Sequence, residues 1–279
     1  PTPPPAATPD PPTPRLAPAG VTTRAATAVV PPQAGPAMAE AAEFMAAIPR
    51  DRDLSYIGLV LNGRGLARAI AAGCDEINYA VVVTDTFSQR NQGTTTEEGV
   101  AVWKEIARAA RKAGIRPSLV VSAAFGCPFE GEVPVGSVVE VVEACLDEPP
   151  ERLSLADTIG VAVPSDVTER FEAVMPSIPD NVQLGTHFHN TRGTGLANAL
   201  AALEVGVTSF AASLGGLGGC PFAPNATGNI VTEDLAYMLA RMGFETGLDL
   251  EVLAETAEWV KQHLPDSVVG LYHRAGPFP

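Results

Sequence analysis

Short apolar runs alternate along the chain with longer segments in which apolar residues recur at helical spacing. The runs are rich in valine, isoleucine and leucine and predict strands, whereas the longer segments predict helices. Regular alternation of the two is typical of parallel β/α units. The predicted strands are Val21–Val30, Ser55–Leu61, Glu76–Val83, Ser118–Ser122, Arg152–Ala156, Gln183–His189 and Ser209–Ser213. The predicted helices are Pro36–Ala47, Gly65–Ala72, Thr95–Ala113, Gly136–Leu146, Ser165–Met175, Gly195–Val205, Thr232–Met242 and Leu250–His263.

The number of these repeats and the residues that follow their strands distinguish between two α/β architectures. A doubly wound sheet would carry a glycine-rich phosphate turn after its first strand, and no such turn follows Val30. Polar residues instead follow several strands at their carboxyl ends, where a TIM barrel places its reactive groups. The predicted strands are one fewer than the eight of a TIM barrel. The sequence therefore predicts an α/β fold of the TIM (β/α)8 type that is incomplete, with its first strand missing.

Proline dominates the start of the chain, where the first 36 residues hold 12 of the 26 prolines. Proline fixes φ and removes a backbone donor, so this stretch does not begin as a packed element. We predict a disordered, proline-rich tail over residues 1–20 and one TIM-barrel domain over residues 21–279.

The net charge and the cysteine content limit the kinds of binding partner and the cellular compartment that we expect. The net charge of −14 repels phosphate backbones and anionic membranes, so we expect neither a nucleic-acid nor a membrane partner. No apolar run is long enough to span a bilayer, and the four cysteines form no Cys-x-x-Cys pair. These features favour a small-molecule enzyme of the reducing cytoplasm.

Two histidines stand at the end of an apolar strand, in Gly185-Thr186-His187-Phe188-His189-Asn190. Side chains alternate along a strand, so His187 and His189 share one face while Phe188 packs on the other. Two neighbouring imidazoles suit one cation. The alternative is a pair of hydrogen-bonded core histidines; the position at a strand's carboxyl end favours the metal site.

Four glycines precede a cysteine in Gly215-Gly216-Leu217-Gly218-Gly219-Cys220. Such a loop can bring backbone amides and a thiol close to a substrate, and we expect Cys220 to be accessible there. The alternative is a small buried cysteine. Further on, Asn229 offers a neutral oxygen ligand or, alternatively, a cap for the next helix.

Single acids carry weaker signals. Asp157 ends a strand, where a carboxylate could orient a proton or ligand, or only stabilise a turn. Glu233 and Asp234 follow Asn229 closely, and either carboxylate could simply favour the positive end of a helix. Cys74 and Cys145 lie in alanine-rich helical surroundings and indicate packing.

Together these segments resemble the 3-hydroxy-3-methylglutaryl-CoA lyase family, within the wider group of TIM-barrel metal-dependent lyases and Claisen-type synthases. The resemblance runs from about residue 38 to 263, and the glycine-cysteine loop separates the lyases from the synthases. The specific matches are Phe87-Ser88-Gln89-Arg90-Asn91, Gly126-Cys127-Pro128-Phe129-Glu130-Gly131, Asp157-Thr158-Ile159-Gly160, His187-Phe188-His189-Asn190, the glycine-cysteine loop, Gly228-Asn229 and Thr232-Glu233-Asp234.

The resemblance implies a reaction and a set of site residues. The reaction is cleavage of a 3-hydroxy-3-methylglutaryl-CoA-like thioester to acetyl-CoA and acetoacetate, with Mg²⁺ or Mn²⁺ as cofactor and Zn²⁺ as an alternative. The partner is an acyl-CoA substrate, and a homo-oligomer stays open. The implied residues are His187, His189 and Asn229 as metal ligands, Cys220, Asp157 and Glu233 as catalytic groups, and Ser154 and Thr158 as substrate contacts.

The chain departs from the family pattern near its start. The family's first strand ends in Arg-Asp-Gly, which supplies a carboxylate ligand and a cation for the enolate, and this sequence contains no Arg-Asp-Gly. Ala25 stands where the family carries a glutamate, and a truncated or frame-shifted gene start would produce both differences. Two alternatives to an active lyase follow: a catalytically inactive barrel fragment or scaffold, and a related metal-dependent aldolase or Claisen-type synthase.

Overall fold

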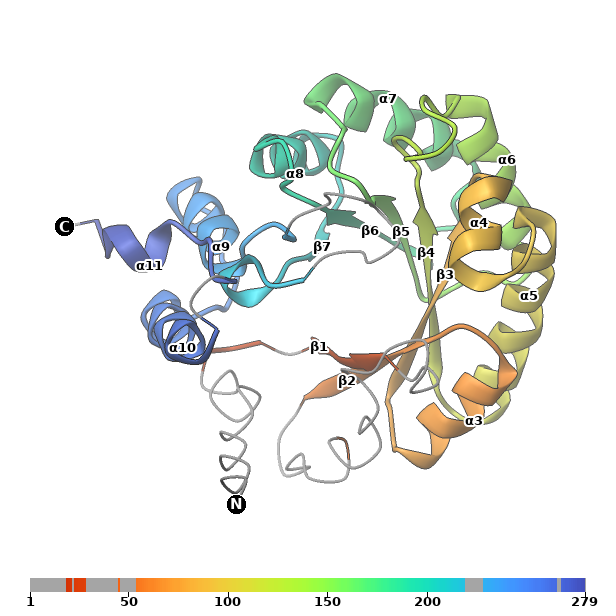
Figure 1. The fold of residues 1–279 in the computed structure, drawn as a ribbon, viewed down its shortest axis with the longest axis horizontal. Helices are drawn as coiled ribbons and strands as arrows, with labels where there is room; N and C mark the ends of the chain where they lie inside the picture. The colour runs from red at the N-terminus through yellow and green to blue at the C-terminus, as the bar shows by residue number, and fades with distance from the viewer. Residues whose placement is uncertain are drawn as a thin grey trace, which may run out of the picture.

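Seven parallel strands form one curved sheet in the computed structural model, which describes residues 19–21, 23–28, 45, 54–218, 228–264 and 267–278. The strands are hydrogen-bonded in chain order, and helices cover the outer face of the sheet (Figure 1). Within the described ranges, no pairing joins the last strand to the first. The strands are β1 (Thr23–Ala28), β2 (Ser55–Val60), β3 (Glu76–Val82), β4 (Arg116–Ser122), β5 (Arg152–Asp157), β6 (Gln183–Phe188) and β7 (Ser209–Ala211).

This sheet confirms the prediction of an incomplete TIM-type barrel, and each predicted strand is present with ends shifted by a few residues. β1 pairs with β2 through a register shift between Ala25 and Thr27. The helices are α3 (Gly63–Ala71), α4 (Asp85–Gln92), α5 (Thr96–Lys112), α6 (Val135–Cys145), α7 (Pro164–Val174), α8 (Gly195–Glu204), α9 (Thr232–Arg241), α10 (Leu250–His263) and α11 (Tyr272–Ala275). The predicted helix Pro36–Ala47 lies outside the described residues apart from Met45.

Two helices were not predicted. The polar stretch after β3, for which no helix was predicted, forms α4, which buries Phe87 and Ser88 and ends at Gly93 in the left-handed conformation. Too few apolar positions mark this helix for periodicity to reveal it. The short helix α11 is held by contacts from α9 described below. Among the described residues, no helix is long and apolar enough to cross a membrane.

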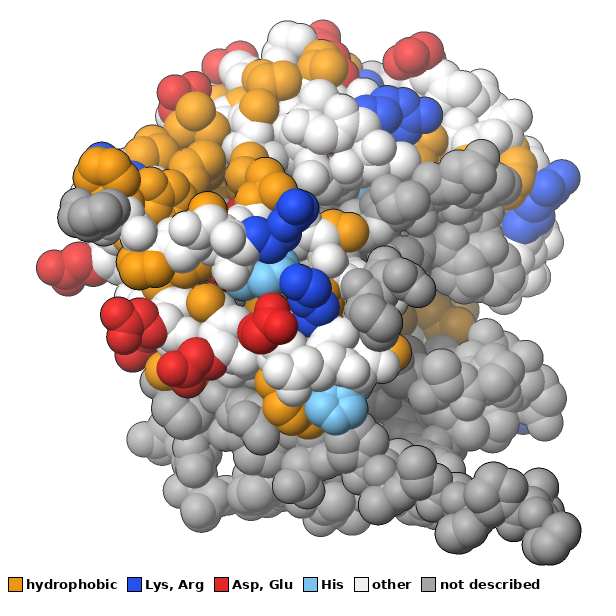
Figure 2. Space-filling view, turned by 60° about the vertical axis from the view of Figure 1, so that its left-hand side comes forward, with side chains coloured by type: hydrophobic (Ala, Val, Ile, Leu, Met, Phe, Trp, Pro, Cys, Tyr) orange, Lys and Arg blue, Asp and Glu red, His pale blue; other side chains and the backbone are white. Residues whose placement is uncertain are grey.

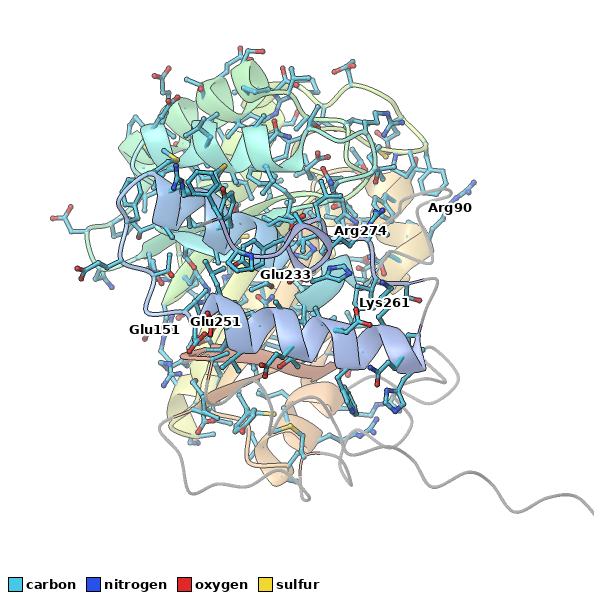
Figure 3. The ribbon with its side chains drawn as sticks, turned by 90° about the vertical axis from the view of Figure 1, so that its left-hand side faces the viewer. Arg90, Glu151, Glu233, Glu251, Lys261 and Arg274 are labelled. Atoms are coloured by element: carbon cyan, nitrogen blue, oxygen red, sulfur yellow. The ribbon has the colours of Figure 1, made fainter. Side chains whose placement is uncertain are left out.

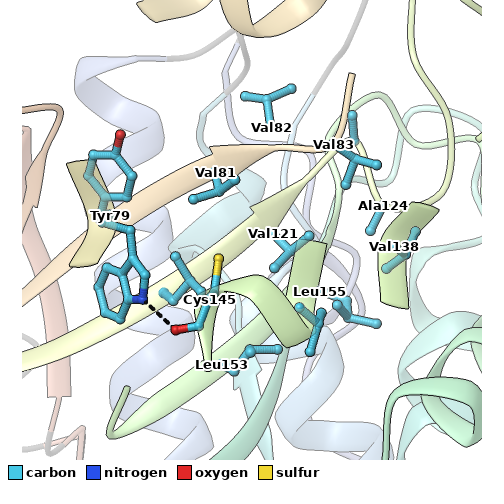
Figure 4. Close-up of a cluster of buried hydrophobic side chains, with 14 of the residues drawn as sticks. Tyr79, Val81, Val82, Val83, Val121, Ala124, Val138, Cys145, Leu153 and Leu155 are labelled. Carbon is cyan, nitrogen blue, oxygen red and sulfur yellow. Dashed lines mark hydrogen bonds between the residues drawn. The ribbon is translucent and has the colours of Figure 1, made fainter. Parts of the chain in front are cut away.

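The main core lies between the sheet and the outer helices (Figure 4). Tyr79 on β3 stacks on Trp103 of α5, with ring centroids 6.3 Å apart. The Trp103 Nε1–H donates to the carbonyl oxygen of Cys145, at 3.1 Å, so the buried indole leaves no donor unpaired. Cys74 and Cys145 are buried, as predicted, and burial raises the pKa of the Cys145 thiol to about 12. Both therefore act as packing groups.

The amino ends of β3, β4 and β5 carry a buried polar network. The Glu76 carboxylate pairs with Arg152 and accepts the hydroxyl hydrogen of Ser118 at 2.5 Å. Arg116 Nε lies 3.6 Å from the same carboxylate. Each of these charged groups thus has an opposite charge or a hydrogen-bond partner beside it, which a buried carboxylate requires.

A smaller apolar cluster joins the start of the described chain to its end. Ala19, which we predicted to lie in the tail, is fully buried with Leu253 and Ala257 of α10, and its carbonyl oxygen accepts the N–H of Asp249 at 2.9 Å. Gly20 has φ 78°, and a Cβ there would meet the Gly247 carbonyl oxygen at 1.9 Å. Residues 1–18 lie outside the described part of the chain.

Candidate functional site

The two histidines of the predicted metal motif lie together at the carboxyl end of β6. Their ring centroids are 5.2 Å apart and the rings are nearly perpendicular. Phe188 between them points to the other face and packs edge-on against Phe125. Burial, and secondarily the neighbouring His189, lowers the pKa of His187 to about 4. The His187 imidazole is therefore neutral at physiological pH, which is the form that binds a metal.

Asn229 lies directly beside this pair. It forms an antiparallel bridge with His189, and the following residue, Ile230, donates its N–H to the Phe188 carbonyl oxygen at 3.1 Å. Asn229 does not cap α9, because the residue at the helix start is Val231 and no side chain caps it. An isolated bridge between two segments distant in sequence therefore brings His189 and Asn229 together.

The two polar atoms of the Asn229 side chain differ in their hydrogen bonding. Its Nδ2 donates to the Leu217 carbonyl oxygen at 2.8 Å, which fixes the orientation of the amide. Its Oδ1 is buried and has no hydrogen-bond partner within the described part of the chain. A buried acceptor without a partner costs about 1–3 kcal/mol, so such an atom needs an explanation.

The glycines of the predicted loop make room for this amide. Gly218 has φ 112°, and a Cβ there would lie 2.5 Å from Asn229 Nδ2. Gly216 has φ 78°, and its Cβ would lie 3.4 Å from the Asn229 carbonyl oxygen and 2.8 Å from Val269. Only glycine combines this backbone conformation with so close an approach. The loop residues Gly219 and Cys220 lie outside the described residues.

Glu233, in the first turn of α9, binds the same glycine loop. Its side chain is fully buried, and both carboxylate oxygens lie within hydrogen-bond distance of the Gly215 N–H, at 3.0 and 3.1 Å. Burial is the main cause that raises the pKa of Glu233 to about 7, with a smaller contribution from Asp234. A carboxyl group with a pKa near neutrality is suited to proton transfer.

Asp234 binds a different segment. Its carboxylate accepts the N–H groups of Leu271 and Tyr272, at 3.0 and 2.7 Å, at the start of α11. The segment before α11 then reaches the glycine loop, because the Val269 N–H donates to the Gly215 carbonyl oxygen at 2.8 Å. No role was predicted for this C-terminal segment, since no local pattern marks a contact with residues so distant in the chain.

The remaining predicted residues brace the rim of the barrel. Asp157 is fully buried and accepts the N–H groups of Val161 and Ala162, both at 3.0 Å. Burial raises the pKa of Asp157, and these hydrogen bonds partly offset that effect. The carboxylate therefore stabilises the turn after β5, the simpler of its two predicted roles.

Thr158 and Ser154, the predicted substrate contacts, differ in depth. Thr158 Oγ1 accepts the N–H of Ala123 at 2.9 Å, where Ala123 has φ 57°. Ser154 pairs in register with Gly185, two residues deeper than His187, and a Cβ on Gly185 would meet Ser154 Oγ at 2.6 Å. Thr158 therefore lies at the rim, and Ser154 lies inside the sheet.

Two imidazoles and one unpartnered amide oxygen form a donor set that fits a divalent cation. The described residues contain no group of three or more His, Cys, Asp and Glu side chains placed to hold a metal. Asn190, which follows the histidines, accepts the Gly195 N–H at the start of α8 with its Oδ1. The set thus has nitrogen and neutral oxygen donors without a carboxylate.

Known proteins are similar to this chain in sequence and in fold. Residues 25–260 match the family model described as HMGL-like. The chain belongs to this family. The hydroxymethylglutaryl-CoA lyase YngG of Bacillus subtilis is 39% identical over 238 residues, which are 85% of this chain and 79% of that protein. The (R)-citramalyl-CoA lyase of Chloroflexus aurantiacus is 40% identical over 222 residues, which are 80% of this chain and 70% of that protein.

Solved structures agree with the sequence matches. The crystal structure of the Bacillus subtilis HMG-CoA lyase superimposes with a TM-score of 0.89 at 36% identity, covering 94% of this chain and 87% of that one. An Acinetobacter baumannii HMG-CoA lyase in complex with coenzyme A and 3-methylmalate gives 0.89 at 36% identity, covering 95% and 88%. The predicted membership of the HMG-CoA lyase family and its barrel fold are confirmed.

Proposed function

We propose that this protein is a carbon–carbon lyase that cleaves 3-hydroxy-3-methylglutaryl-CoA to acetyl-CoA and acetoacetate. The observation that carries the proposal is the juxtaposition of His187, His189 and the unpartnered Asn229 Oδ1 at the carboxyl end of the sheet, in a chain of the HMGL-like family. The acyl-CoA substrate is supported by the relatives named above and by the lyase solved with coenzyme A.

The metal ligands in this proposal are His187, His189 and Asn229. A bound Mg²⁺ or Mn²⁺ would polarise the substrate's hydroxyl and carbonyl oxygens, with Zn²⁺ as the alternative that the nitrogen donors favour. The chain's own contribution to the binding is to hold the Asn229 oxygen in place through the Leu217 carbonyl and the glycines behind it.

The bonds that break and form in the proposed reaction follow from the structure of the substrate. A general base takes the 3-hydroxyl proton, and the oxygen forms the ketone of acetoacetate as the C2–C3 bond breaks and its electron pair passes to the thioester as an enolate. Protonation of the enolate carbon by the Cys220 thiol then gives acetyl-CoA. The protonated base later returns its proton to the Cys220 thiolate. Glu233 and Asp157 support these steps by holding the glycine loop and the turn after β5, and Thr158 contacts the substrate at the rim, with Ser154 below it.

The test is an assay of the purified chain with 3-hydroxy-3-methylglutaryl-CoA and Mg²⁺ or Mn²⁺. Equal amounts of acetyl-CoA and acetoacetate support the proposal, and a His187→Ala variant that folds normally should release neither. A folded, unmodified chain that releases neither product would overturn it and favour the inactive barrel.

Citramalyl-CoA is a second candidate substrate, because the (R)-citramalyl-CoA lyase of Chloroflexus aurantiacus matches this chain as well as the HMG-CoA lyases do. Both candidates are thioesters with a 3-hydroxyl group. The same assay with each thioester at equal concentration ranks them by kcat/KM, and acetyl-CoA is the product measured in both.

A further inference from the structure

His273, on α11, is a half-buried titratable group that the proposed mechanism does not use. Both of its ring nitrogens are shielded from solvent, and neither has a hydrogen-bond partner within the described residues. A neutral imidazole carries one N–H donor and one acceptor, so two buried polar atoms are left unused. Groups of this kind are rare in folded proteins and point to an interaction that one static arrangement does not show.

The Glu233 carboxylate and this ring both lie close to the bare face of Gly270. A Cβ built on Gly270 would lie 2.9 Å from Glu233 Oε1 and 3.2 Å from His273 Nδ1. The absence of a side chain at Gly270 therefore leaves the carboxylate and the imidazole facing one small space. Both atoms lie within 3.2 Å of this one point, a separation that a single bridging water spans.

The surroundings keep the ring neutral. Burial, followed by the positive charge of Lys261, lowers the pKa of His273, and Arg274 acts in the same direction. Glu258 on α10 and Asp234 on α9 oppose this effect. Figure 3 shows Glu233, Lys261 and Arg274 on the same side of the molecule. Figure 2 shows basic, acidic and histidine side chains gathered in one small area of this side.

We propose that His273 is a positioning residue for Glu233, to whose Oε1 its ring N–H is hydrogen-bonded through one bridging water across the face of Gly270. The bond favours the ionised carboxylate, which accepts the Gly215 N–H and thereby sets the glycine loop beside Asn229. The C-terminal segment thus acts on the active site through Glu233. The kinetic consequence rests on the proposed lyase function, whereas the titration of Glu233 does not.

The experiment compares His273→Phe, which has no donor, with His273→Gln, which keeps one. The free energy of unfolding of the full chain is measured from pH 5 to 8.5 in each variant, with Glu233 present and with Glu233→Gln. We expect His273→Phe to move the Glu233 titration to higher pH by about one pH unit, since the charged form loses a hydrogen bond. His273→Gln should restore most of the shift. The control His263→Gln changes an exposed histidine of α10 and should leave the titration unchanged.

The outcomes separate this proposal from the lyase proposal. A shift that vanishes in the Glu233→Gln background supports the His273–Glu233 interaction, whether or not the chain is active. If the chain is a lyase, the acidic limb of its kcat/KM profile moves by the same amount. An unchanged titration in His273→Phe, or a shift that persists without Glu233, would overturn the proposal. Should His273→Phe not fold, Gly270→Ala places a methyl group between the two side chains and tests the same shift.

Discussion

The two ends of the sheet bury polar groups in opposite ways. At the amino ends, the Glu76 carboxylate is surrounded by Arg152, Ser118 and Arg116, so each charge is compensated. At the carboxyl end, the Asn229 Nδ2 donates to the Leu217 carbonyl oxygen, and Oδ1 has no hydrogen-bond partner among the described residues. The first arrangement stabilises the fold alone, whereas the second costs stability and keeps a binding atom ready.

The largest effect should come from the unpartnered oxygen. Asn229→Ala should lower kcat by at least about 100-fold, because loss of a ligand or of a charge-stabilising group typically costs that much. The free energy of unfolding should change little, since removing the buried oxygen, which has no partner within the described residues, offsets the loss of the hydrogen bond from Nδ2 to Leu217. Steady-state kinetics and urea unfolding of the same preparation check both statements. A loss of stability that matches the loss of activity would place Asn229 with the structural residues.

At the amino ends of the strands, where Glu76 is paired, a substitution should lower stability and leave activity unchanged. Glu76→Gln should lower the free energy of unfolding by about 3 kcal/mol, because the partly buried Arg152 loses its counter-charge. Activity per folded molecule should stay the same. Glu151→Gln, an exposed neighbour, is the control and should change stability little. A fall in kcat for Glu76→Gln at full folding would show that the two ends are coupled.

The pH dependence of stability sharpens the comparison at Glu233. Its pKa of about 7 in the folded chain is above the value near 4.5 of an exposed glutamate, so the folded state binds the proton more tightly than the unfolded state. Stability from this group is therefore present below pH 4.5 and is lost as pH rises toward 7. Between pH 5 and 7.5 we expect the wild type to lose about 2 kcal/mol relative to Glu233→Gln. Parallel curves for the two proteins would contradict the buried, titrating carboxyl group.

The smallest expected effect comes from two glycine variants that separate the cost of backbone strain from the cost of a steric contact with Asn229. Gly218→Ala and Gly206→Ala both place alanine at positive φ, at 112° and 95°, but only the first brings a Cβ to within 2.5 Å of the Asn229 amide. Both variants should lose about 1 kcal/mol of stability. Only Gly218→Ala should also lose activity, by about 10-fold, because it displaces the Asn229 side chain. Equal activity in the two variants would show that the position of the amide is not critical.

The sequence by itself determined the strand–helix order and one face of the site. Apolar runs bounded by turns locate β1–β7, because a strand buried by helices must be apolar along its outer face. Alternation along β6 places His187 and His189 on one side, and the structure has their rings 5.2 Å apart. Helix α4 was not predicted because its segment is polar and buries little more than Phe87.

Tertiary structure alone decided how the remaining groups are used. Nothing local to Asn229 shows that Leu217 takes its nitrogen, or that Glu233 and Asp234, adjacent in sequence, bind the glycine loop and the start of α11. The contact of His273 with the space beside Gly270 depends on the same packing. Such pairings join residues far apart in the chain, and only the closure of the fold fixes which donor meets which acceptor.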